Sequence, residues 1–137
     1  MRSTKPILLV EDDQVDAMTV KRALKDIKVT NRLDIVNNGE EALIFLRNPE
    51  NEQLGIILLD LNMPRMNGIE FLEIAKSDDD LKKIPIVVLT TSKEEQDKVD
   101  SFNLGVAGYM IKPVDYLKFV EVIKTIDLYW SLSELPD

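Results

Sequence analysis

Five short apolar segments, each followed by a more polar stretch, constrain the fold of this chain more than any other feature. They span residues 7–10, 33–36, 56–59, 86–89 and 106–111. The first, third and fourth are apolar at every position, as expected of strands buried on both faces of a parallel sheet. The second alternates in polarity and the fifth contains Gly108, which favours sheet edges for both.

Amphipathic segments fill the intervals between these strands. Within residues 14–27, apolar residues recur at the ~3.6-residue period of a helix. The apolar sets are Ala17, Val20, Leu24 and Ile27; Ala42, Leu43 and Leu46; Ile69, Leu72 and Ala75; Val99 and Phe102; and Phe119, Val120, Ile123 and Ile126. Repeated strand–helix alternation predicts right-handed crossovers with helices on both faces. We therefore expect an α/β fold with a doubly wound, five-stranded parallel sheet of order 2-1-3-4-5, the flavodoxin-like topology.

A length of 137 residues favours one domain with one core. We expect residues 1–127 to form this domain, with residues 128–137 as a C-terminal extension. The extension contains Tyr129, Trp130, Leu132 and Leu135. It either packs on the same domain or contacts a second copy, since aromatic residues are enriched in interface cores.

Composition excludes several classes of function. The chain has no cysteine and no histidine, which removes disulfides, thiolate or histidine metal sites and Ser–His triads. The net charge of −8 argues against direct DNA binding. No apolar run approaches the roughly 20 residues of a membrane helix, and no apolar signal segment follows the N-terminus. We therefore expect a cytoplasmic protein without membrane contact.

Polar residues follow the central strands of the expected sheet. They are Glu11-Asp12-Asp13, Asp60, Thr90 and Lys112. The carboxyl ends of parallel strands meet at one edge, so these groups should converge there. Crowded carboxylates need neutralisation, and Mg²⁺ prefers oxygen ligands. Alternatively, Glu11, Asp12 and Asp13 only cap the following helix; Asp13 fits this interpretation, whereas the coincidence with Asp60 favours a metal site for Glu11 and Asp12.

Asp60 is the strongest candidate for a functional residue, because an unpaired charge at the end of a buried strand is costly. Beside Mg²⁺, its carboxylate could attack phosphorus and form an acyl phosphate. The hydroxyl of Thr90 and the cation of Lys112 could stabilise the phosphoryl oxygens. Each of these two residues has an ordinary structural interpretation when taken alone.

The ordered set of motifs resembles the receiver domain of bacterial two-component response regulators, over about residues 6–127. The matching motifs are Val10 to Asp13, Leu59 to Pro64 with Gly68, Leu89-Thr90, Gly108-Tyr109 and Lys112-Pro113. The resemblance implies a signalling module that catalyses its own phosphorylation and slow dephosphorylation, without ordinary substrate turnover. Its phosphoryl donor would be a sensor histidine kinase.

The resemblance also implies residue roles. Glu11 and Asp12 would hold Mg²⁺ with Asp60, the phosphoacceptor, and Asn62 would add its backbone carbonyl. The phosphoryl group would be contacted by Thr90 and Lys112. Thr90 and Tyr109 would act as switch residues, changing a target-binding face made by the fourth helix, fifth strand and fifth helix.

A finer likeness links the chain to stand-alone regulators of bacterial phytochrome-type histidine kinases. It rests on Leu89 to Ser92, Lys112 to Asp115, Tyr129-Trp130 and Leu135-Pro136. In that group the C-terminal extension helps to form a homodimer, so the resemblance implies a possible homodimer through residues 128–137, and packing of the extension on its own domain stays open as the alternative.

Three alternatives remain open. An Asp-nucleophile phosphohydrolase would carry a second acid where this chain has Asn62, which does not transfer protons at neutral pH. A flavodoxin-like redox carrier would need a phosphate-binding loop where this chain has Glu11-Asp12-Asp13. A degenerate receiver would bind its partner without being phosphorylated.

Overall fold

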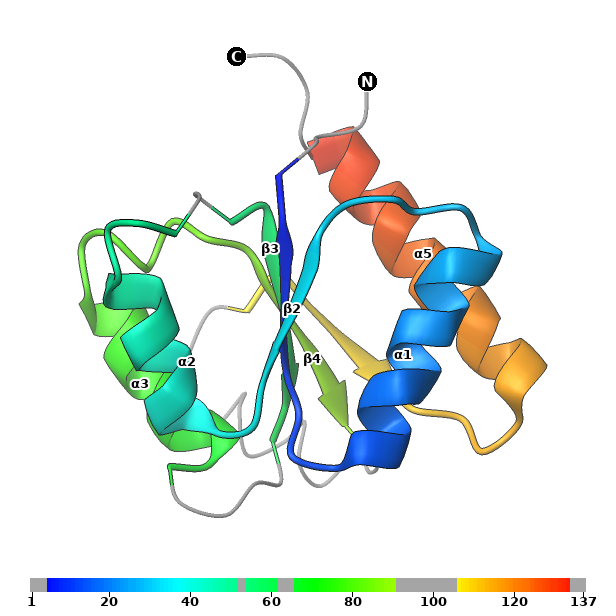
Figure 1. The fold of residues 1–137 in the computed structure, drawn as a ribbon, viewed down its shortest axis with the longest axis horizontal. Coiled ribbons are helices and arrows are strands. Elements are labelled where there is room, and N and C mark those ends of the chain that lie inside the picture. The colour runs from blue at the N-terminus through cyan, green and yellow to red at the C-terminus, as the bar shows by residue number, and fades with distance from the viewer. Residues whose placement is uncertain (1–4, 52–53, 62–65, 91–105, 134–137) are drawn as a thin grey trace.

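The computed structural model describes residues 5–51, 54–61, 66–90 and 106–133. Its centre is a five-stranded parallel sheet of order β2-β1-β3-β4-β5 (Figure 1). The strands are β1 (Ile7–Val10), β2 (Leu33–Val36), β3 (Ile56–Asp60), β4 (Ile86–Thr90) and β5 (Gly108–Ile111). The predicted fold class and strand order are confirmed, including the edge positions of β2 and β5.

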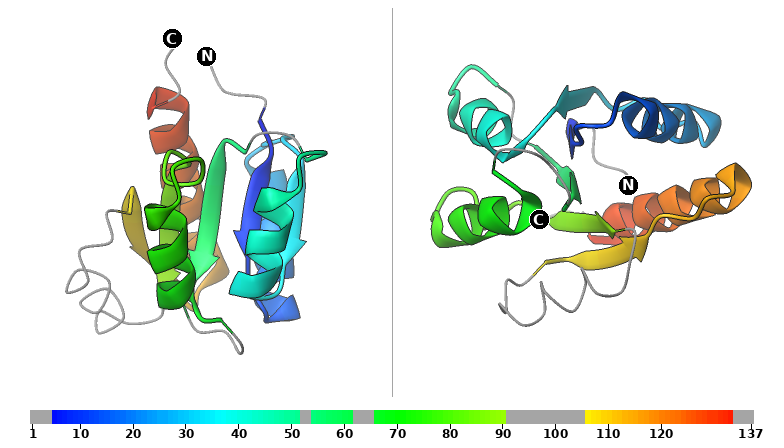
Figure 2. Two further views of the ribbon diagram at one scale, coloured as in Figure 1. Left: turned by 90° about the vertical axis from the view of Figure 1, so that its left-hand side faces the viewer. Right: turned by 90° about the horizontal axis from the view of Figure 1, so that it is seen from below.

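Helices cover both faces of the sheet. The described helices are α1 (Gln14–Asp26), α2 (Gly39–Arg47), α3 (Gly68–Ser77) and α5 (Tyr116–Ser133). Figures 1 and 2 show α1 and α5 on one face and α2 and α3 on the other. The helix predicted around Val99 and Phe102 falls outside the described residues.

The core consists of two apolar layers separated by the sheet. Along β3, Ile57 and Leu59 pack in the layer under α2 and α3, while Ile56 and Leu58 pack in the layer under α1 and α5. Successive strand residues point to opposite faces, so a strand that is apolar throughout contributes to both layers. Asp60, which ends this strand, is the exception to that apolar pattern.

Side-chain caps fix where the helices begin. Asp13 caps α1, its Oδ1 accepting hydrogen bonds from the backbone N–H groups of Val15 at 2.8 Å and Asp16 at 3.1 Å. Asn38 caps α2 in the same way, and Asn67 opens α3 with a capping box. Such caps satisfy backbone donors that a helix leaves unpaired at its start.

Helix α5 extends further than the apolar pattern alone indicates. It continues through Ser133, so residues 128–133 belong to the helix. Trp130 lies four residues after Ile126 and seven after Ile123, which places all three on one helix face. Trp130 is only 2% exposed and packs in the layer under α1 and α5. Leu132 and Leu135 fall outside the described side chains.

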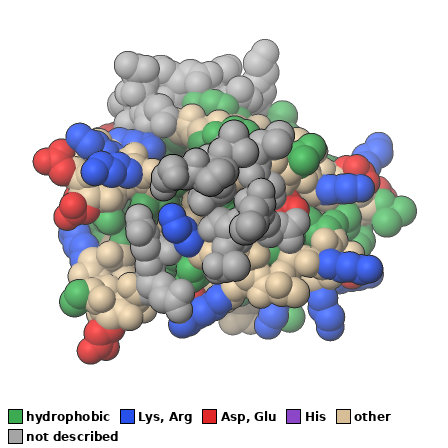
Figure 3. Space-filling view, turned by 90° about the horizontal axis from the view of Figure 1, so that it is seen from above, with side chains coloured by type: hydrophobic (Ala, Val, Ile, Leu, Met, Phe, Trp, Pro, Cys, Tyr) green, Lys and Arg blue, Asp and Glu red, His purple; other side chains and the backbone are tan. Residues whose placement is uncertain are grey.

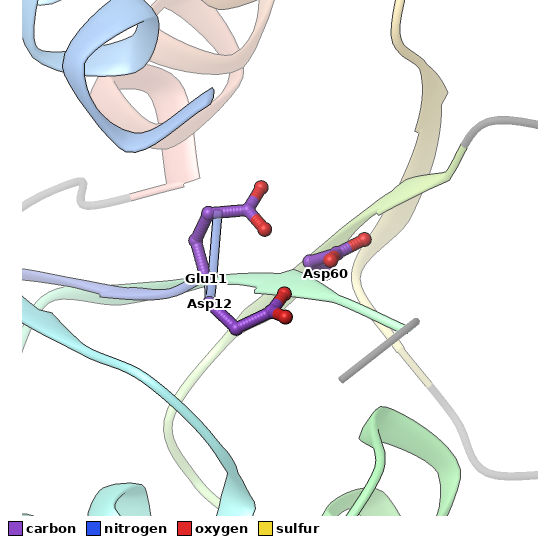
Figure 4. A group of neighbouring side chains, drawn as sticks. All are labelled: Glu11, Asp12 and Asp60. Carbon is purple, nitrogen blue, oxygen red and sulfur yellow. The ribbon is translucent and has the colours of Figure 1, made fainter. Parts of the chain in front are cut away.

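The two ends of the sheet differ in character. Figure 3 views the end where the strands begin, and side chains of both charge signs surround this face. The opposite end, where the strands finish, holds the acidic residues discussed below (Figure 4). In the part of the chain that the structure describes, no helix is long and apolar enough to cross a membrane.

Candidate functional site

Three carboxylates meet at the carboxyl end of the sheet (Figure 4). Glu11 and Asp12 directly follow β1, and Asp60 ends the neighbouring strand β3. One oxygen atom from each carboxylate lies within 4.8 Å of the others, a spacing that could hold a metal ion. Glu11 and Asp60 are buried, at 2% and 5% exposure, while Asp12 is exposed. Pairing of β1 with β3 brings these strand ends together.

Lys112 supplies a cation to this acid cluster. It follows β5, and its Nζ lies 3.1 Å from Glu11 Oε1, 3.3 Å from Asp16 Oδ2 and 3.6 Å from Asp60 Oδ1. Its side chain is only 11% exposed. Burial by itself lowers the pKa of Lys112, but the combined effect of Asp60, Glu11 and Asp16 outweighs burial and raises it. Lys112 is therefore protonated at neutral pH.

Glu11 shows that one lysine does not neutralise the cluster. The pKa of Glu11 is raised to about 8, mainly by burial and in addition by the neighbouring Asp60, while Lys112 opposes the shift. Buried carboxylates favour protonation when their charge is uncompensated. A divalent cation would replace that proton, because metal ligands must be deprotonated. Three oxygen donors, two of them buried and short of positive charge, fit a hard cation such as Mg²⁺.

The other residues that the sequence predicted for the site lie outside the acid cluster or outside the described side chains. Thr90 ends β4 next to the strand of Asp60, but its side chain is outside the described set, as is Asn62 altogether. Tyr109 lies in the edge strand β5, half-buried against the layer under α2 and α3. Asp13 caps α1 and is not part of the metal-spaced group among the described residues, in line with the capping interpretation.

Asp16 is a site residue that the sequence patterns missed. It lies in the first turn of α1, and its carboxylate contacts Lys112. An acidic residue in a first turn is usually explained by the helix dipole, so its presence there gave no signal of a long-range partner. The only cue was its position three residues after the cap, close in sequence to Glu11 and Asp12.

Comparisons with protein families and with curated proteins agree on one family for this chain. Residues 7–124 match the family described as response regulator receiver domain. Among curated proteins, response regulator Rcp1 of Synechocystis sp. is 38% identical over 130 residues, covering 92% of this chain and 88% of the relative.

Two solved structures are similar over nearly the whole chain. The phosphorylated cyanobacterial phytochrome response regulator RcpA superposes with a TM-score of 0.88 at 36% identity, covering 98% of this chain and 100% of that one. The Mn²⁺-bound form of response regulator Rcp1 has a TM-score of 0.83 at 36% identity, covering 97% of each chain.

Proposed function

Because this chain belongs to the family of response regulator receiver domains, we propose that Asp60 is its phosphoacceptor. Receiver domains are signalling modules rather than classical enzymes, and phosphoryl acceptance with Mg²⁺ dependence is general in the family. The observation that carries the assignment is the position of Asp60. It is a nearly buried carboxylate at a strand end, within one cluster with Glu11 and Asp12 and 3.6 Å from Lys112 Nζ.

Glu11, Asp12 and Asp60 would hold Mg²⁺ through their carboxylates, with the backbone carbonyl of Asn62 as a further ligand. The bound ion would supply positive charge that screens the acceptor carboxylate from an incoming phosphoryl group. The support from this chain is the spacing of three carboxylate oxygens and the shortage of positive charge around Glu11. The Mn²⁺-bound relative is consistent with a divalent ion in this fold.

In the proposed transfer, a carboxylate oxygen of Asp60 attacks the phosphorus of a phosphohistidine. An O–P bond of an acyl phosphate forms while the N–P bond of the donor breaks, and the imidazole leaves. The cationic Nζ of Lys112 and the hydroxyl of Thr90 would contact the phosphoryl oxygens as charge shifts. Slow hydrolysis of the acyl phosphate would then reset the domain.

The response would be a change of partner binding. The new anion at Asp60 would draw Thr90 inward and favour a buried position of Tyr109, which is half-buried here. This rearrangement would alter the target-binding face around β5, α5 and the segment preceding β5. A phytochrome-type sensor histidine kinase is the proposed donor, by analogy with relatives that are phytochrome response regulators. Such an exchange would take place in the cytoplasm, and it requires no contact with DNA.

Residues 1–127 would form the receiver domain, and the outward-facing side chains of the extension, residues 128–137, would form a self-association surface. Leu128 and Tyr129 are exposed, at 61% and 43%, whereas the adjacent Trp130 is buried. An apolar pair beside a firmly anchored residue is a reasonable contact for a second copy. Light scattering of the protein over a concentration series would test this, with Tyr129→Ser as the variant; a constant monomer mass would contradict it.

Intact mass spectrometry after incubation with acetyl phosphate tests the acceptor. We expect one phosphate adduct that needs Mg²⁺, disappears in EDTA and is absent from Asp60→Asn. Asp79→Asn is the matched control, since this aspartate side chain is 93% exposed and lies between α3 and the start of β4, whereas the cluster lies at strand ends. An adduct that persists in Asp60→Asn would contradict the assignment. Steady turnover of a phosphomonoester would instead favour a phosphohydrolase.

A further inference from the structure

We propose that Asp16 is a positioning residue, which keeps the Lys112 cation beside Asp60 when a divalent cation occupies the acid cluster. The inference rests on the proposed function and deepens it, because it concerns how Lys112 stays available to the phosphoryl group. Asp16 itself touches neither metal nor phosphoryl group in this scheme.

Two separate elements create the contact. Asp16 is held in the first turn of α1 by the Asp13 cap, which binds the backbone N–H of Asp16 directly. Lys112 comes from the segment between β5 and α5, and its Nζ donates to Asp16 Oδ2 at 3.3 Å and to Glu11 Oε1 at 3.1 Å. Asp60 Oδ1 lies at 3.6 Å. The three N–H donors of an ammonium group thus face three carboxylates.

The three carboxylates are not equivalent. Glu11 and Asp60 belong to the metal-spaced group, but Asp16 does not. A divalent ion in that group would neutralise Glu11 and Asp60 and repel the nearby ammonium. Of the three carboxylates, Asp16 would then be the one that keeps its full attraction for the Lys112 ammonium.

The surroundings provide a route by which Lys112 could leave. Asp16 and Lys112 line one surface groove together with Val15, Pro113 and Val114. Val114 is fully exposed, and the Asp16 side chain is 47% exposed. Without the carboxylate of Asp16, a lysine repelled by the bound ion could turn into this groove, where water solvates it. Its flexible stem permits this motion.

The test compares wild type, Asp16→Asn and Asp26→Asn. Asp26→Asn makes the same charge change in α1, but the partners of the Asp26 carboxylate are Tyr116 and Arg22 rather than Lys112. Phosphorylation by acetyl phosphate is followed by intact mass at saturating Mg²⁺. Independently, amine acylation of Lys112 in Mg²⁺ is quantified by peptide mass spectrometry against Lys124, an exposed lysine of α5 in the same sample.

We expect Asp16→Asn to lower the limiting phosphorylation rate about two- to five-fold, the effect of losing one partly exposed ion pair. It should also increase acylation of Lys112 relative to Lys124. Asp26→Asn should match wild type in both measurements. Unchanged acylation of Lys112 in Asp16→Asn, or an unchanged or faster phosphorylation rate, would overturn the proposal. A wild type that forms no adduct would indicate either a receiver that accepts the phosphoryl group only from its kinase or a degenerate receiver, while the acylation comparison would still decide the role of Asp16.

Discussion

At the scale of single residues, Glu11 carries a large electrostatic cost, because burial and the neighbouring Asp60 both disfavour its charged form. It is buried beside Asp60, whereas Asp12 in the same cluster is exposed and can be solvated. Lys112 is shared among Glu11, Asp16 and Asp60, so its one charge is divided. The metal-free fold therefore tolerates an unfavourable group at the place where a cation would be useful, as functional sites often do.

This cost predicts a pH-dependent stability of the metal-free protein. The pKa of Glu11 is about 8 in the folded state and 4.5 ordinarily, so the folded protein binds one more proton between these values. The contribution of protonated Glu11 to the free energy of unfolding is fully present below pH 4.5. It is lost as pH rises from 4.5 through 8, by at most about 1.4 kcal/mol per pH unit. Urea unfolding in EDTA at several pH values measures it.

Glu11→Gln is the control for that prediction, because glutamine keeps the shape and cannot ionise. In EDTA, the free energy of unfolding of wild type should fall relative to that of Glu11→Gln as pH rises from 5 to 8. Mg²⁺ should reverse the trend in wild type and have a weaker effect in the variant. A difference that stays constant over this range would mean that Glu11 is ionised throughout.

Strand order explains which site residues the sequence could predict. Glu11, Asp60 and Lys112 each follow or end a strand, and strand ends of a parallel sheet converge, so their meeting could be deduced. Asp16 could not be deduced, because its contact depends on how α1 is rotated and on the conformation after β5. The locations of Asn62 and of the Thr90 side chain stay predictions.

At the scale of elements, two glycines make backbone contacts with Leu61 and Met66, described residues between β3 and α3. Gly39, the first residue of α2, donates its N–H to Met66 O at 3.0 Å, and Gly68 donates to Leu61 O at 3.1 Å. A Cβ added at Gly39 would lie 2.8 Å from Met66 O, and one at Gly68 would lie 2.7 Å from Leu61 Cα. Glycine thus permits close approach on both sides of the segment that follows Asp60.

We predict different effects on stability for two Gly→Ala substitutions. Gly39→Ala should lower the free energy of unfolding by about 1–3 kcal/mol, since backbone and side-chain atoms of Met66 must move. Gly108→Ala has nothing within 4 Å of the new Cβ and should be neutral or stabilising by up to about 1 kcal/mol. Denaturant unfolding of both variants measures this, and equal destabilisation would contradict the close packing at Gly39.

The element boundaries show where periodicity is informative. The first two strands have the predicted bounds, while β3 and β4 each extend by one polar residue, Asp60 and Thr90. A pattern based on apolar residues ends too early when a polar side chain completes a strand. The fifth strand begins at Gly108 rather than at residue 106, since ladder pairing with β4 starts there.

At the scale of the whole molecule, the sheet separates stability from chemistry. The acid cluster lies at the carboxyl ends of the strands, and Trp130 belongs to the same apolar layer as Ile7 and Ile56 at the amino ends. A Cβ at Gly55 would lie 2.6 Å from Cζ2 of Trp130, which shows how closely the indole covers this end. Substitution of a residue that anchors α5 at this end can therefore change the stability of the fold without contacting the acid cluster.

Trp130→Ala should accordingly destabilise the fold and spare the chemistry. We expect a loss of about 3–5 kcal/mol in the free energy of unfolding, as for other buried aromatic side chains replaced by alanine. At low temperature, where the variant is folded, its rate of phosphorylation by acetyl phosphate should equal that of wild type. Circular dichroism during urea unfolding and intact mass measure the two quantities.

Tyr129→Ala is the neighbouring control, because Tyr129 is 43% exposed against 2% for Trp130. In a monomer it should change stability by only about 0.5 kcal/mol, as most surface substitutions do. If residues 128–137 join two copies, Tyr129→Ala would lose more at high protein concentration than at low, since assembly stabilises by mass action. A slow phosphorylation rate in folded Trp130→Ala would instead show that the two ends of the sheet are coupled.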